Sequence, residues 1–292
     1  MGEVTIEGLY EQVRSRVPVR ADETIPTVTP VAPGIRVLAL RTPTLPPAAH
    51  TNVYLVGPDG GPVAVVDPGS PYIDQQAVLD RVLEALPIAL VLLTHHHGDH
   101  VGGAAALAAR WGVPIAAHPA TARRLAGRVE VTQLVEDGEV VHGVTAVFTP
   151  GHAEGHLCFE LGDALIAGDM VAGVGTILID PSEGDMAQYL ASLERMSARG
   201  QRMLLPAHGP ALRDGQGKLA EYLAHRRMRE QRVVAALTTA GGAGATPGEL
   251  VATAYDDTPR MLWPLAERSL LAHLIKLANE GRARESAGRW SA

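Results

Sequence analysis

Four of the twelve histidines of the chain lie in one short stretch, residues 94–100, which reads THHHGDH. An aspartate, Asp99, lies among them. Imidazole nitrogens and carboxylate oxygens are common ligands of divalent zinc in proteins. This concentration of ligand types predicts a metal centre, whereas a solvated turn would not explain why an apolar run leads straight into it.

The residues of this stretch that can bind metal follow the order H-x-H-x-D-H and are His95, His97, Asp99 and His100. On a helix, residues two apart point in different directions, so the order differs from that of helical zinc motifs. It suits a loop that leaves a buried strand, here the apolar run 88–94. We expect His95 and His97 to face one ion, Asp99 and His100 to reach a second, and His96 to face away.

Two ions need more ligands than one loop supplies. Single polar residues follow other apolar runs within glycine-containing loops, and they are His152, Asp169 and His208. Each would be weak evidence alone, because a lone loop histidine usually has no special role. Sites are commonly built on loops at one end of a strand scaffold, so together the three predict the missing ligands.

Other candidates are left open. His156 either supports a ligand or is an ordinary residue at the start of a strand. Asp67, in the stretch VVDPGS, either caps a turn or accepts the second N–H of a metal-bound histidine. The histidines expected to be surface or structural residues are His50, His118, His142, His225 and His273.

The composition describes an acidic chain that can form a core. It has 292 residues, 46% of them hydrophobic, and a net charge of −7, which argues against bulk polyanion binding. Residues 223–292 nevertheless carry ten basic and seven acidic side chains, so a local anion-binding surface remains open. The basic cluster of that region comprises Arg226, Arg227, Arg229 and Arg232, for which phosphate contacts and a solvated helix face are both considered.

Cysteine usage and the N-terminus favour a cytoplasmic protein. Cys158 is the single cysteine, so no disulfide within the chain is expected, and its apolar surroundings predict a core residue rather than a nucleophile. The first residues have early acids and no apolar run, unlike a signal peptide. No apolar segment reaches the roughly 18 residues of a membrane span.

Strands and helices must position the candidate ligands. Strands are expected at 34–41, 52–57, 62–67, 88–94, 114–118, twice near 131–141, and at 144–150, 157–161 and 164–168, and residues 203–210 are expected to form a strand that opens into a loop. Helices are expected at 8–17, 72–86, 101–112, 185–200 and 214–238. The Pro-rich loop 41–50 and residues 171–184 are expected to shape the pocket.

The last part of the chain differs in character. After a Gly-rich break come a capped helix at 246–255, an amphipathic helix at 265–282 and a short hairpin at 282–290. This order is that of a winged-helix module. We therefore expect a catalytic domain over residues 1–222 and a winged-helix-like domain over residues 223–292.

Six stretches of the sequence resemble the metallo-β-lactamase superfamily. They are TNVYLVG (51–57), VVDPGS (65–70), THHHGDHVGG (94–103), TPGHAEGH (149–156), GDM (168–170) and AHGP (207–210). The resemblance implies an α+β fold, the αββα sandwich, with metals at one edge between the sheets. It further implies that one ion is held by His95, His97 and His152, the other by Asp99, His100 and His208, and that Asp169 bridges them.

The expected cofactor is a pair of Zn²⁺ ions, with Mn²⁺ or Fe²⁺ as alternatives. Two divalent cations lower the pKa of a bridging water, so that hydroxide exists near neutral pH, and they stabilise the charge that develops on the substrate. Asp99 is also the candidate catalytic residue, because it can orient this water or take its proton.

The C-terminal part is similar to the endoribonuclease branch of this superfamily, which implies hydrolysis of single-stranded RNA. The alternative is a small-molecule thioester, ester or lactone hydrolase similar to glyoxalase II, and a β-lactamase is a weaker third option. A winged-helix binding module with a vestigial metal core and a mononuclear iron oxidoreductase are disfavoured by the complete ligand set. The expected partners are a small molecule or single-stranded RNA and no membrane, and a homodimer is kept as an option.

Overall fold

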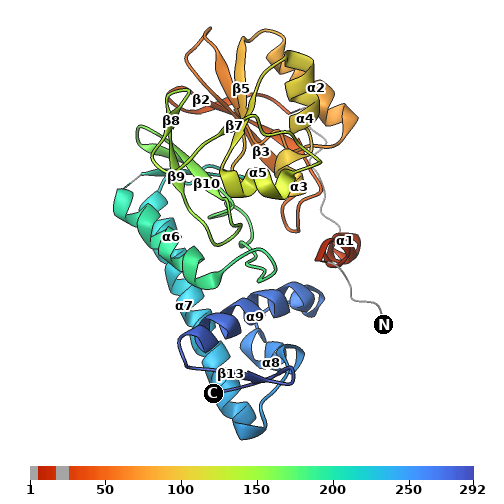
Figure 1. Ribbon diagram of the computed structural model, residues 1–292, viewed down its shortest axis with the longest axis vertical. Coiled ribbons are helices and arrows are strands. Elements are labelled where there is room, and N and C mark those ends of the chain that lie inside the picture. Colours follow the sequence, from red (N-terminus) through yellow and green to blue (C-terminus); the bar gives the residue numbers. More distant parts are fainter. Residues whose placement is uncertain (1–5, 18–25, 201) are drawn as a thin grey trace.

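The computed structural model describes residues 6–17, 26–200 and 202–292. Two β-sheets face each other in the upper part of Figure 1. The first sheet has the order β1 (Thr29–Ala32), β2 (Ile35–Arg41), β3 (His50–Val56), β4 (Val63–Val66), β5 (Ile88–Leu92), β6 (Ile115–Ala117), β7 (Gln133–Leu134). The second sheet has the order β12 (Met203–Pro206), β11 (Ala164–Gly168), β10 (Leu157–Leu161), β9 (Val144–Phe148), β8 (Val140–Val141).

The space between the two sheets is filled by apolar side chains from both of them. Val66 and Leu92 of the first sheet belong to the same buried cluster as Phe159 and Ile166 of the second. Strands buried on both faces carry continuous apolar runs, which is why 88–94 and 164–168 contain few polar residues. Burying these two faces against each other is the main driving force for forming the sandwich.

Helices cover the outer face of each sheet. On the first sheet lie α2 (Ile73–Leu83), α4 (Ala104–Trp111) and α5 (Pro119–Leu125). On the second lie α6 (Met186–Arg199) and the first turns of α7 (Gly215–Ala240). The layer order is therefore helix, sheet, sheet, helix, and the predicted αββα sandwich is confirmed.

The strand directions explain where polar residues collect. β4 and β5 are parallel, so Asp67 and the histidine stretch leave their sheet at the same edge. β11 is parallel to β12, and β10 is antiparallel to both β9 and β11, so β9, β11 and β12 also run in one direction. The loops after these strands carry the remaining candidate ligands, so the candidates meet at one edge of the sandwich.

Two sequence predictions about elements need correction. The helix expected at 101–112 starts earlier and is broken, because α3 (Gly98–Val101) ends before α4 begins at Ala104. The two strands expected near 131–141 do exist, but β7 belongs to the first sheet and β8 to the second. Both strands have only two residues, so their own pattern is too short to indicate a pairing partner.

The C-terminal part contains the predicted winged-helix order. After α7 come a 3₁₀ turn η1 (Gly241–Ala243), α8 (Pro247–Ala254), η2 (Arg260–Leu262), α9 (Trp263–Asn279) and the hairpin β13 (Arg284–Ser286) and β14 (Arg289–Ser291). This part has its own apolar cluster, in which the end of α7 packs with α8 and α9. Because α7 runs through residues 222 and 223, the boundary placed there stays a prediction.

The N-terminal helix α1 (Ile6–Arg16) contacts η2, and Figure 1 shows it on the same side of the molecule as the start of α9. Among the described helices, none is long and apolar enough to cross a membrane.

Candidate metal centre

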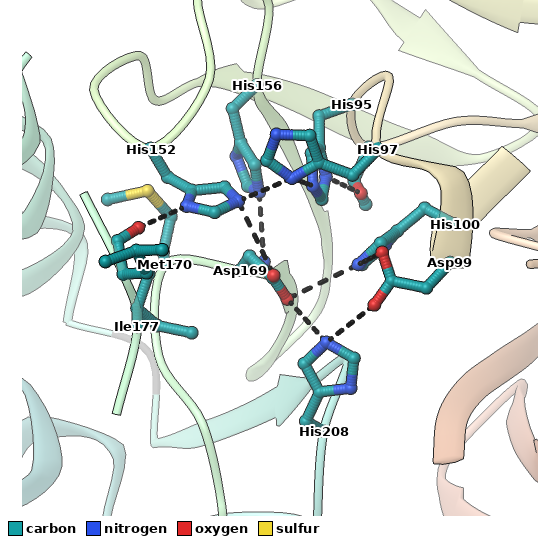
Figure 2. A network of polar contacts seen from close by, with 12 residues as sticks. His95, His97, Asp99, His100, His152, His156, Asp169, Met170, Ile177 and His208 are labelled. Carbon is teal, nitrogen blue, oxygen red and sulfur yellow. Dashed lines mark hydrogen bonds and ion pairs between the residues drawn. The ribbon is translucent and has the colours of Figure 1, made fainter. Parts of the chain in front are cut away.

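The seven predicted ligands converge at one edge of the sandwich (Figure 2). His95 and His97 follow β5, His152 lies between β9 and β10, and Asp169 and His208 follow β11 and β12. Two groups of ligand atoms form, each with its atoms within 4.8 Å of one another: His95, His97, His152 and Asp169 in one, Asp99, His100 and His208 in the other. The seven ligands are far apart in the sequence, and the arrangement of the strands brings them together.

In the first group, each imidazole has one nitrogen committed to a fixed acceptor. His97 Nε2 lies 2.7 Å from a carboxylate oxygen of Glu183, and His152 Nδ1 lies 2.9 Å from the carbonyl oxygen of Leu178. His95 Nδ1 lies 2.9 Å from Thr94 Oγ1, whose own proton goes to a carboxylate. Since these nitrogens donate, the opposite nitrogens carry lone pairs.

Those three lone pairs point at one another. His95 Nε2 is 2.8 Å and His152 Nε2 is 3.0 Å from His97 Nδ1. Three unprotonated nitrogens at this spacing repel unless a positive ion lies among them. The donor set therefore fits a metal cation, and neutral imidazole is the form in which histidine binds metals.

In the second group, too, each imidazole has one nitrogen next to a fixed acceptor. His100 Nδ1 lies 2.8 Å from Asp67 Oδ2, and His208 Nδ1 lies 3.0 Å from the carbonyl oxygen of His50. Their Nε2 atoms therefore carry the lone pairs. His100 Nε2 is buried without a hydrogen-bond partner among the described residues, and it lies 4.0 Å from Asp99 Oδ1.

Asp169 presents one oxygen to each group. Its Oδ2 is 3.5 Å from His152 Nε2, and its Oδ1 is 3.5 Å from His100 Nε2 and 3.3 Å from His208 Nε2. This is the arrangement required of a bridging carboxylate, as Figure 2 shows. The backbone before it is Gly168 at φ 48°, where a side chain would lie 2.5 Å from His156 Nε2.

His156 supports this carboxylate rather than joining the ligands. Its Nδ1 lies 2.9 Å from Thr149 Oγ1, and its Nε2 accepts the backbone N–H of Asp169 at 3.1 Å. Asp67 is the carboxylate that holds His100, and it also accepts the N–H and hydroxyl of Thr94 at 2.8 and 2.6 Å. Metal-binding histidines are usually oriented by such partners.

The electrostatics of the second group also favour a cation. Burial alone would lower the pKa of His100, but Asp169, Asp99 and Asp67 together raise it well above its ordinary value. Burial would raise the pKa of Asp169, yet His208 and His100 hold it well below its ordinary value. A metal ion and a proton are both positive charges at the same lone pair, so the carboxylates that attract one attract the other.

The comparison with protein families agrees with this geometry. Residues 46–208 match the model of the metallo-beta-lactamase superfamily, and this segment is more than half of the chain. The chain belongs to the metallo-β-lactamase superfamily. Residues 246–290 match the beta-lactamase associated winged helix domain. Members of this superfamily are metal-dependent hydrolases, so the chain is an enzyme of that class.

Several related proteins align with this metallo-β-lactamase superfamily chain over most of their length. The lactamase-like protein vrtG of Penicillium aethiopicum is 34% identical over 272 residues, covering 83% of this chain and 84% of that protein. The beta-lactamase-like protein 2 homolog of Drosophila melanogaster is 29% identical over 282 residues, covering 90% and 94%. The match extends beyond the sandwich into the C-terminal helices.

Solved structures show the same fold. A metallo-beta-lactamase family protein from Thermus thermophilus has a TM-score of 0.72 and 25% identity, covering 89% of this chain and 99% of that chain. A beta-lactamase domain protein from Burkholderia ambifaria has a TM-score of 0.76 and 24% identity, covering 92% and 97%.

Glu183 was not among the residues predicted from the sequence. This carboxylate lies in the segment 171–184 and contacts two histidines, His97 at 2.7 Å and His96 at 2.9 Å. His96 was expected only to face away from the ions, and it does so by turning to Glu183. A lone glutamate in a Gly-containing loop carries no pattern of its own, so only the tertiary structure could place it.

The segment 171–184 also links the C-terminal helices to the first group of ligands. Arg268 of α9 binds Asp180 with two contacts of 2.8 Å, and Arg226 of α7 donates to the carbonyl of Ile177. The next carbonyl, Leu178, accepts from His152. The C-terminal part therefore holds a loop that orients ligands of the metal centre.

We expect Glu183→Ala to weaken metal binding by about 10–100-fold, the usual effect of removing the partner of a metal-bound histidine. Without the carboxylate, the ring of His97 is no longer held with Nδ1 toward the other ligands. Glu183→Gln keeps a hydrogen-bond acceptor, so its metal affinity should lie between those of the wild-type protein and Glu183→Ala. Competition titration with a coloured zinc chelator measures this, with Glu154→Ala as the control. Equal affinity in all four proteins would contradict the assigned role of Glu183.

A cavity of about 860 Å³ opens onto the metal centre. The predicted pocket segments do line it, the first through Pro43–Ala48 and the second through Val174–Leu178 and Glu183. Helices of the C-terminal part close another side with Arg226, Tyr255 and Leu265. The helix α1 also contributes Tyr10 and Arg14, so one cavity joins the ligands to walls from several regions of the chain.

The arginines of the basic cluster of α7 are divided between the interior and the surface. Arg226 and Arg229 are buried, and Arg229 forms an ion pair of 2.8 Å with Asp257. Arg227 pairs with Glu194 at 2.9 Å, and Arg232 pairs with Asp256 and Asp257 at 2.5 and 2.8 Å. Helical spacing puts some of these arginines on the inner face, where carboxylates of neighbouring elements meet them.

The remaining residues behave mostly as expected. Cys158 is buried, and burial raises the pKa of its thiol to about 12, so it is a core residue. His118 accepts the N–H of Ala120 at the start of α5, and His273 is buried in α9. His225 differs, because it lines the cavity.

Proposed function

We propose that this chain is a dinuclear metal-dependent hydrolase of esters or thioesters with a bulky, largely apolar acyl group. The observation that carries the proposal is the cavity beside the ligands. Its walls are rich in apolar side chains, among them Leu45, Pro47, Ile177, Leu178, Leu262 and Leu265. Concave, mostly apolar cavities with few polar groups are typical of small-molecule sites.

Zinc is the metal we propose, because five imidazoles and two carboxylates form a borderline ligand set. A pair of divalent cations supplies hydroxide near neutral pH and stabilises negative charge on the substrate. Each of the five histidines has its other ring nitrogen beside a hydrogen-bond acceptor, which fixes the direction of its ring. The apolar walls exclude water from the acyl group.

Asp99 is proposed as the group that receives the proton of the attacking water. Its carboxylate lines the cavity and is only 3.6 Å from His208 Nε2. Burial would raise the pKa of Asp99, but His100 and His208 hold it below its ordinary value, so the group is an ionised acceptor.

Cleavage of single-stranded RNA is the second candidate. The winged-helix part supports it, together with Arg124 and Arg128 at the mouth of the cavity. Arg124 pairs with Glu154, however, and Arg227, Arg229 and Arg232 of α7 also form ion pairs with carboxylates, which leaves less free positive charge for phosphate. Aromatic residues for base stacking are scarce at 4% of the chain. A β-lactam is a third candidate, supported by relatives named lactamase-like.

Purified zinc-loaded protein should hydrolyse aryl esters and acyl thioesters at least about 100-fold faster than it cleaves single-stranded RNA or opens a chromogenic lactam. Dialysis against a strong chelator should remove this activity, and added zinc should restore it. Elemental analysis of the same samples should give two metal ions per chain when active. RNA cleavage without ester or thioester turnover would replace the first candidate by the second.

A further inference from the structure

We propose that the C-terminal wall of the cavity recognises a carboxylate on the acyl group, remote from the bond that is cleaved. This inference rests on the proposed ester or thioester hydrolysis and names the substrate class. The group assigned to the recognition is the guanidinium of Arg226, which lines the cavity although its residue is only 3% exposed.

Arg226 differs from its neighbours on α7 because it has no carboxylate partner among the described residues. Arg227, Arg229 and Arg232 are all paired with glutamate or aspartate. Two of these three, Arg227 and Arg232, are more exposed than Arg226, so water solvates their charge and they need a carboxylate partner less. A buried charge is normally paired, since leaving it alone in a medium of low polarity is costly.

Arg226 contacts a backbone carbonyl and an aromatic ring, and it forms no ion pair among the described residues. One terminal nitrogen donates to the carbonyl of Ile177, the guanidinium carbon lies 5.2 Å from the ring centre of Tyr189, and Nε is buried without a hydrogen-bond partner among the described residues. Burial, and after it the charges of Arg226 and Arg229, lower the pKa of His225 nearby. Asp257 has the opposite effect on the pKa of His225, but its carboxylate pairs with Arg229 and Arg232, so Arg226 has no carboxylate partner of its own among the described residues.

Polar side chains that can assist an anion lie on the same wall. Thr258, Ser269 and His225 line the cavity together with Arg226. A carboxylate accepts several such hydrogen bonds at once, and bonds to an ionised acceptor are the stronger kind. An uncharged apolar end of a substrate would leave the guanidinium unpaired.

The ligands His97, Asp99 and His208 line another part of the same cavity. A substrate that fills it therefore places its ester or thioester carbonyl at the metal centre and its carboxylate at Arg226. In the reaction, the carbon–sulfur or carbon–oxygen bond breaks and a bond from carbon to the water oxygen forms. One water proton goes to the leaving group, and the other is released when the new acid ionises, so the product is a dicarboxylate.

The test compares ω-carboxyacyl thioesters with their ω-methyl esters over a series of chain lengths. Wild-type enzyme should prefer the carboxylates by at least about tenfold in kcat/KM at one best length, and the methyl esters should show no such optimum. Calorimetry on the wild-type zinc enzyme should likewise show that the dicarboxylate product binds more tightly than its monomethyl ester, with no variant required.

Three variants test which residue causes the preference for the carboxylate. In Arg226→Met, the ratio of kcat/KM for the carboxylate to that for the methyl ester should fall to about one, beyond any loss of turnover that both substrates share through the segment 171–184. Arg227→Met removes an exposed arginine of the same helix and should keep the preference. Arg268→Met loosens the segment 171–184, which Arg226 also contacts, and should lower turnover of both substrates equally, which separates loop damage from loss of the cation.

An equal kcat/KM for both substrates in the wild-type enzyme would overturn the proposal, as would a preference that survives in Arg226→Met. If Arg226→Met does not fold, Arg226→Lys replaces it and should retain part of the preference. If the wild-type enzyme hydrolyses neither the ω-carboxyacyl thioester nor its ω-methyl ester, the proposed function is wrong. Calorimetry with the dicarboxylate then tests the carboxylate site at Arg226 independently of turnover.

Discussion

Asp169→Asn is expected to lower hydrolytic activity by about 10³-fold or more, the scale of losing a central electrostatic group at a metal centre. Asp169 is the residue whose two oxygens face different ligand groups, at 3.5 Å from His152 and 3.3 Å from His208. An amide keeps the shape but loses the negative charge and presents an N–H₂ group to one set of lone pairs. Both metal positions are therefore damaged by a single substitution.

Steady-state kinetics and metal analysis check this expectation together. The variant should bind fewer than two ions per chain after dialysis against zinc at the concentration that saturates the wild-type protein. Asp163→Asn changes an exposed carboxylate in the turn between β10 and β11, and it should leave both measurements unchanged. A variant that retains two tightly bound ions and near-normal turnover would show that Asp169 does not bridge the site.

Asp67→Ala is expected to lower the free energy of unfolding by about 3–5 kcal/mol, the range found when a buried charged partner is removed. Asp67 is buried and accepts from the N–H and the hydroxyl of Thr94 and from His100 Nδ1. Its removal leaves all three donors without their acceptor in the interior. Urea denaturation of the metal-free protein measures the loss without any contribution from metal binding.

Asp67→Asn separates the structural role from the role at the metal centre. Asparagine tolerates the backbone of this position, where φ is 50°, and can still accept the N–H of Thr94. Its N–H₂ group faces His100 Nδ1, however, so the proton of His100 is driven to Nε2, the nitrogen needed by a metal. This variant should lose metal affinity more than stability, whereas Asp59→Asn, in an exposed turn, should change neither. Equal loss of both properties in Asp67→Asn would reject the proposed tautomer.

Much of the fold could be predicted from local sequence. Apolar runs of strand length, such as 164–168, and amphipathic stretches bounded by caps, such as 185–200, indicate their secondary structure directly. Asp185 does cap α6 through Gln188 N–H, and Thr246 and Glu249 form the capping box of α8. The break between α3 and α4 and the assignment of β7 and β8 to different sheets were missed, because long-range pairing decides them.

The ligands were predictable for a different reason. Metal binding requires a few residue types at strand ends, and His95, His152 and Asp169 have that setting in the sequence itself. The residues that orient these ligands were harder to predict. Asp67 could be suggested from its position after a strand, but Glu183 could not, since its carboxylate meets His96 and His97 only after a loop folds back.

By itself, the sequence determined the strands and helices, the winged-helix order and the seven candidate ligands, because these depend on local periodicity and on polar residues that follow buried strands. The sandwich was implied only by the resemblance of its motifs to a known superfamily. The tertiary structure alone decided what the arginines of α7 do. Their sequence indicates positive charge, but a charge binds phosphate, pairs with a neighbouring carboxylate or lines a cavity unpaired according to which groups the fold brings within a few ångströms of it. That is why Arg227 forms a surface ion pair and the adjacent Arg226 lines the cavity without one.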